Sequence, residues 1–163
     1  MIYNRKYVIN NIKSVIDNRK IFKDKILYQV MTTIEEHKKI LEELEEDINE
    51  KIRAKLLSRR QKIIGFTTSE ASTNLFALFL HIKNLIPPGL NINHRFFVSS
   101  KRAEDKFKFN FPRKEEILSF MVKQEEFRTK LCYGKDKEAK LVEESIKNFF
   151  KLKSLIEKEI KKE

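Results

Sequence analysis

The residues able to carry acid–base, nucleophilic or metal chemistry are few in this sequence. The position three residues before each histidine holds Ile, Leu or Asn, so none of the three belongs to the Glu-x-x-His pattern of carboxylate-bridged metal sites in bundles. The single cysteine, Cys132, excludes a thiolate zinc site and a disulfide within the chain. We therefore expect no metal and no cofactor. The histidines are His37, His81 and His94.

Motifs of enzymatic nucleophiles are also missing. No G-x-S-x-G stretch occurs, and three glycines cannot build a phosphate-binding loop. No arginine lies four to six residues before a histidine, which excludes one type of helical nuclease. The acidic run at 42–47 is interpreted as a solvated helix face. The sequence favours a protein without enzymatic activity, although a site assembled from distant residues would leave no motif.

The strongest electrostatic feature is the stretch KIRAKLLSRRQK at 51–62. Residues 51–65 contain six cations and no acid, whereas residues 31–50 contain two cations and eight acids. In a continuous helix, steps of four, four and three would place four of the cations on one side. Such a row could bind phosphates, or it could simply complement the negative end of a helix dipole. The candidate residues are Lys51, Arg53, Lys55, Arg59, Arg60 and Lys62.

A second candidate is KFKFNFPRK at 106–114, where lysine and phenylalanine alternate. Exposed aromatics among cations can stack on nucleic-acid bases. Burying a phenylalanine is favourable by roughly 1.5–3 kcal/mol, however, so we predict that Phe107, Phe109 and Phe111 are buried. The neighbouring cations would then form the binding face: Lys101, Arg102, Lys106, Lys108, Arg113 and Lys114.

Length and composition indicate the number of domains, the net charge and the absence of a membrane span. At 163 residues the chain fits a single domain, 1–163, and its formal charge of +11 attracts anionic partners. The most apolar stretch, 75–86, is interrupted by polar residues and is too short to span a membrane. No cationic leader precedes an apolar run, so we expect a cytoplasmic protein without a membrane partner.

Hydrophobic periodicity predicts the elements that must position these residues. A first helix is expected at about 3–16 and a long one at about 20–63, whose apolar seam repeats every seven residues from Leu27 to Ile48. Gly65 would close this helix, and TTSE at 67–70 would cap the next one, at about 68–86.

The last third of the chain is expected to complete the bundle. Residues 88–111 form either a non-helical loop or a short hairpin, the loop having room for a helical turn. A helix then runs from Pro112 to about Gly134, and a last helix spans about 136–160. The predicted fold is all-α: an antiparallel bundle of four main helices, one of them long.

Two functional hypotheses follow. The first is a non-enzymatic basic protein that binds nucleic acid through its phosphate backbone. The alternative is a protein-interaction or self-associating module, with no nucleic-acid role, in which the seam of the long helix forms a homodimer.

Overall fold

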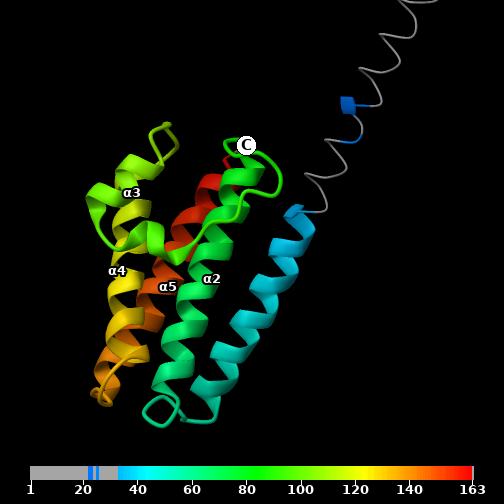
Figure 1. Cartoon of the computed structure of the whole chain (residues 1–163). Coiled ribbons are helices and arrows are strands. Elements are labelled where there is room, and N and C mark those ends of the chain that lie inside the picture. Colours follow the sequence, from blue (N-terminus) through cyan, green and yellow to red (C-terminus); the bar gives the residue numbers. More distant parts are fainter. Residues whose placement is uncertain (1–21, 24, 26–32, 163) are drawn as a thin grey trace, which may run out of the picture.

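The computed structural model describes residues 22, 23, 25 and 33–162 of the chain. Four main helices run alternately up and down: a helix over residues 33–53, α2 (Gln61–Ile82), α4 (Lys114–Cys132) and α5 (Ala139–Ile160) (Figure 1). Helix α2 contacts both α4 and α5, which also contact each other. The predicted all-α bundle is confirmed. The predicted helix at 3–16 and the start of the long helix lie outside the described residues.

The predicted continuous helix to residue 63 is wrong, because the helix ends at residue 53. Lys55 adopts a left-handed conformation with φ of 54°. Its N–H donates to the carbonyl of Ile52, and the Leu56 N–H donates to the carbonyl of Lys51, which is the Schellman pattern. Glycine usually occupies the left-handed position, so a lysine there leaves no signal in the sequence. The turn at 54–60 reverses the chain direction.

Gly65 does not end a helix but lies in the second turn of α2. A Cβ atom at this position would lie 2.7 Å from Cβ of Leu131 on α4, so the missing side chain permits close helix packing. The predicted capping box at 67–70 is also wrong. Thr67, the expected cap residue, lies inside α2, where its hydroxyl donates to Oδ2 of Asp47 at 3.1 Å, and the N-cap of α2 is Arg60.

The segment after α2 is a loop with helical turns rather than a hairpin. It contains a 3₁₀ helix, η1 (His94–Phe97), and a short helix, α3 (Ser100–Lys106), and no strand occurs among the described residues. Phe107 and Phe111 are buried, and Phe109 is partly buried against the core. Phe76 of α2 contacts Phe107 and Phe111, so the alternating phenylalanines line the bundle and not its surface.

The remaining elements agree with the predicted bounds to within a few residues. Glu115 and Glu116 occupy the first turn of α4, and Gly134 follows that helix with φ of +82°. The seam of the 33–53 helix packs into the core of the chain itself, where Leu41 and Ile48 are buried.

A buried set of polar side chains joins α2, α4 and α5. The Gln124 Nε2 atom donates to the Thr68 hydroxyl and to the Ser145 hydroxyl, each at 2.9 Å. The Gln124 Oε1 atom accepts from Nδ2 of Asn148 at 2.8 Å. Each of these side chains has a partner, so the contact specifies one register between the three helices.

Two histidines stack between the 33–53 helix and α2. The rings of His37 and His81 have centroids 5.5 Å apart, and His37 Nδ1 lies 3.0 Å from Oδ1 of Asn74. His81 is buried, yet neither of its ring nitrogens has a hydrogen-bond partner. A buried histidine ordinarily has a hydrogen-bond partner, and His81 is an exception. Desolvation by burial, and then the nearby His37, lower the pKa of His81.

Across the described part of the chain, none of the helices combines the length and the apolar character that crossing a membrane requires.

Candidate nucleic-acid interface

The twelve predicted binding residues do not form one surface. Residues 51–62 surround the turn at one end of the bundle, while α3 and the segment to residue 114 lie at the other end (Figure 1). The 22 residues of α2 connect the two ends, which corresponds to about 33 Å of helix. The two groups must therefore be considered separately.

At the α3 end, several of the cations have partners nearby. Arg113 pairs with Glu116, and Lys114 Nζ donates to the Phe109 carbonyl at 3.0 Å. Lys106 Nζ lies 4.5 Å above the ring of Phe96. Lys101 and Arg102 are exposed on α3, which also carries Glu104 and Asp105, and Lys108 is exposed just after this helix. Positive charge at this end is interleaved with acids.

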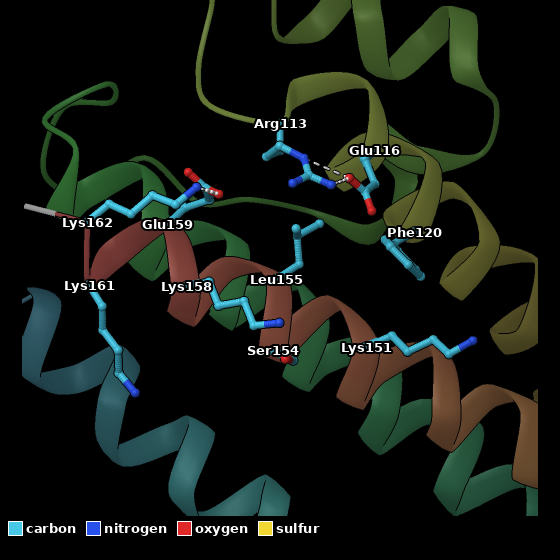
Figure 2. A pocket seen from close by; sticks show the side chains of 10 residues that line it. All are labelled: Arg113, Glu116, Phe120, Lys151, Ser154, Leu155, Lys158, Glu159, Lys161 and Lys162. Atoms are coloured by element: carbon cyan, nitrogen blue, oxygen red, sulfur yellow. Dashed lines mark hydrogen bonds and ion pairs between the residues drawn. The ribbon is translucent and has the colours of Figure 1, made fainter.

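A groove of about 610 Å³ opens between the start of α4 and the end of α5 (Figure 2). Phe120 and Leu155 form its apolar part. Two of its cations are paired with acids that also line it, Arg113 with Glu116 and Lys162 with Glu159. Figure 2 shows the Lys161 side chain directed away from the others. The groove is lined by five cations and two acids, so it is also positive overall, although its acids pair with two of the cations.

The opposite end of the bundle is built from two turns that are joined by hydrogen bonds. Gln61, the first residue of α2, donates from Nε2 to the carbonyl of Lys137 at 2.6 Å. Its Oε1 atom accepts from the Lys137 N–H at 2.8 Å. The turn at 54–60 and the turn at 133–138 are therefore held side by side, although they are far apart in sequence.

This junction brings together two basic stretches. Residues 51–62 and 130–140 contain ten cations and only two acids, Asp136 and Glu138. Lys51 pairs with Asp47. The other nine are exposed, and within the described part of the chain no ion pair joins them to a carboxylate. We call them the turn-end surface: Arg53, Lys55, Arg59, Arg60, Lys62, Lys130, Lys135, Lys137 and Lys140.

Two helix N-termini add hydrogen-bond donors to this surface. Helices α2 and α5 begin here, at Gln61 and Ala139. Neither N-terminus has a side-chain cap and neither first turn contains an acid, although the N-cap residue of α5 is Glu138. Free N–H groups at such positions favour anions, so a phosphate near these starts would meet donors as well as cations.

The sequence prediction found five of the nine cations of this surface and missed four. Lys130, Lys135, Lys137 and Lys140 lie among acids of the C-terminal third, where the net charge is modest, and no row of cations marks them. Lys51, Lys55, Arg59 and Lys62 do not share one helix face, because the helix breaks at 54. Their proximity comes from the turn and not from helical spacing.

No alternative chemistry is apparent in the described residues. They contain no cluster of three or more His, Cys, Asp or Glu side chains able to hold a metal ion. Cys132 is half-buried and its Sγ donates to the carbonyl of Lys62 at 3.4 Å. Burial raises the pKa of this thiol, which keeps it protonated and makes it a poor nucleophile.

Comparison of the chain with models of known protein families, with curated proteins and with solved structures finds no significant match.

Proposed function

We propose that this protein binds nucleic acid through phosphate contacts at the turn-end surface. The observation that carries the proposal is the group of nine exposed cations without an ion-pair partner in the described structure, gathered on one end of the bundle. Charges that serve only solubility are ordinarily dispersed among acids. An uncompensated cluster instead attracts a polyanion and releases its counterions.

The two uncapped helix starts support the same proposal. They supply backbone donors for phosphate oxygens, and such contacts position a protein on a nucleic acid without reading its bases. We therefore expect little sequence preference from this surface.

The test is charge reversal at the two ends of the bundle. One variant replaces Lys55, Arg59 and Arg60 with Glu; the control replaces Lys101, Arg102 and Lys108 with Glu. Each lowers the formal charge of +11 by six and changes exposed side chains only. Fluorescence anisotropy with mixed-sequence DNA and RNA of 20 nucleotides, single-stranded and duplex, measures binding between 50 and 300 mM salt.

We expect the turn-end variant to lose most of its affinity and the control to lose little. For duplex DNA, three lost phosphate contacts would reduce the slope of log K against log salt by about 2.7. Equal losses in both variants would show that net charge alone matters, and unchanged binding in the turn-end variant would refute the assignment. Circular dichroism checks that both variants remain folded.

The alternative hypothesis, self-association through the seam of the long helix, has less support. Over residues 34–48 the seam packs against the core of the same chain, with Ile34 and Leu44 partly buried beside Leu41 and Ile48. A partner helix would have to displace these contacts or use another surface.

A further inference from the structure

Two exposed aromatic side chains lie beside the turn-end surface. Phe66 of α2 is 51% exposed, and Tyr133, directly after α4, is 61% exposed. Phe66 is the one phenylalanine between residues 33 and 162 that is mostly exposed, since the others are buried or packed against the core. An exposed aromatic ring forgoes roughly 1.5–3 kcal/mol of burial, so its position calls for an explanation.

Two contacts between α2 and α4 bring the chain segments that carry these residues close together. The Sγ atom of Cys132 lies 3.4 Å from the carbonyl of Lys62, and a Cβ atom at Gly65 would lie 3.3 Å from the same sulfur. Tyr133 follows Cys132 in the chain, and Phe66 follows Gly65. Phe66 also lies one helical turn after Lys62, so these two side chains share one side of α2.

Two cations of the turn-end surface lie near these residues along the two helices. Lys62 belongs to α2 and Lys130 to the last turn of α4, and both are exposed members of the turn-end surface. The Arg128 guanidinium carbon lies 5.8 Å from the centroid of the Tyr133 ring, a cation–π distance, while the same side chain also pairs with Glu125. The combination of exposed rings with unpaired cations is the arrangement by which proteins bind single strands.

We propose that Phe66 and Tyr133 stack on the bases of a single-stranded nucleic acid whose phosphates contact the turn-end surface. This inference rests on the proposed function and names its substrate class. In a duplex the base faces are covered by neighbouring bases, so the rings could contact only a strand whose bases are unstacked. Stacking is tolerant of sequence, because every base has a π-face.

The first experiment compares three probes of 20 nucleotides by fluorescence anisotropy at 100 mM salt: a mixed-sequence single strand, an abasic strand of the same length and a duplex. We expect the single strand to bind at least tenfold more tightly than the abasic strand. Equal affinity for these two would overturn the stacking proposal and leave the phosphate-binding proposal standing. Failure to bind any of the three would overturn both.

The second experiment changes the rings. F66A and Y133A should each weaken single-strand binding about 5- to 100-fold, with little change for the abasic strand. The matched control is V98A, because Val98 is 52% exposed but lies at the end of η1, away from these rings. Thermal unfolding should show that all three variants keep their stability, since none of these side chains is buried.

A pair of conservative variants separates stacking from apolar docking. F66W should retain single-strand affinity, whereas F66L should lose it, because leucine keeps the apolar surface without a π-face. The chain has no tryptophan, so quenching of the single indole of F66W by added single strand reports stacking directly. Full binding by F66L, or no quenching, would overturn the proposal.

Anionic vesicles of phosphatidylglycerol and phosphatidylcholine provide the remaining comparison, because exposed apolar groups among cations also suit a membrane surface. We expect cosedimentation with vesicles to be unaffected by F66A and to vanish at 150 mM salt. Salt-resistant vesicle binding that F66A abolishes would show that the rings serve a lipid surface and would overturn the stacking proposal.

Discussion

The side-chain amide of Gln61 makes both of its hydrogen bonds to the backbone of one residue, Lys137, 76 positions later in the chain. Gln61 is buried, although it is the first residue of α2 and lies between two exposed turns. The pair acts as a clamp that holds the turn at 54–60 against the turn at 133–138. The proposed interface depends on it, because each turn contributes about half of the cations.

Loss of this clamp should weaken both the fold and the interface. Q61A leaves the backbone N–H and C=O of Lys137 without their partner, so we expect a loss of about 1–3 kcal/mol in the free energy of unfolding. Urea denaturation measures this change. S58A, an exposed substitution in the same turn, should stay within about 0.5 kcal/mol of the parent protein. Equal stability of Q61A and S58A would contradict the role of the clamp.

Gly65 should respond unlike an ordinary helical glycine. Replacing glycine by alanine inside a helix normally stabilises by about 1 kcal/mol. The new Cβ in G65A would lie 2.7 Å from Cβ of Leu131, so α2 and α4 would have to separate. We expect a net destabilisation of about 1–3 kcal/mol, measured by thermal and chemical unfolding. A stabilised G65A protein would show that the two helices are not so closely packed.

The buried polar contact of Gln124 gives a third prediction. Q124M keeps a similar side-chain volume but removes the hydrogen bonds to Thr68, Ser145 and Asn148. Because these partners lose bonds in a buried site, we expect a cost of about 1–3 kcal/mol. The double variant Q124M/S145A should be less destabilised than the sum of the single variants, since both remove one shared interaction. Strict additivity in urea denaturation would argue against a connected network.

The buried ring of His81 should make the free energy of unfolding depend on pH. Its folded-state pKa is lowered below the ordinary value of about 6.5, so the unfolded chain binds a proton more readily than the folded one. Stability contributed by the neutral ring is therefore present above pH 6.5 and is lost progressively as the pH falls below that value. H81F should flatten the stability profile between pH 7 and pH 5.

The same variant tests the unsatisfied ring nitrogens. Neither nitrogen of His81 has a partner, so a phenylalanine of similar shape loses no hydrogen bond. We expect H81F to be at least as stable as the parent protein at pH 8, where the histidine is neutral. Chemical unfolding at several pH values provides both measurements, and an H81F profile parallel to that of the parent would assign the pH dependence to other groups.

Much of the fold was predictable because its signals are local. The heptad pattern predicted a core-facing helix through Leu41 and Ile48, and Gly134 marked the end of α4. The break at 54–60 was not predictable, since Lys55 takes a conformation that glycine usually provides. Gly65 gave the opposite error: its residue type suggested a helix end, whereas it permits close contact with Leu131, 66 positions later in the chain.

The amino-acid sequence by itself determined the helical class, the excess of positive charge, and the burial of two phenylalanines in the KFKFNF stretch. The helical class follows from hydrophobic periodicity and the charge from composition. The burial follows from the cost of exposing apolar rings. Only the tertiary structure decided which cations lie together. It separated Lys55 from Lys101 by the length of α2 and brought Lys62 and Lys130 to one end, because the reversal of the chain and the packing of α4 on α2 set distances that sequence spacing does not contain.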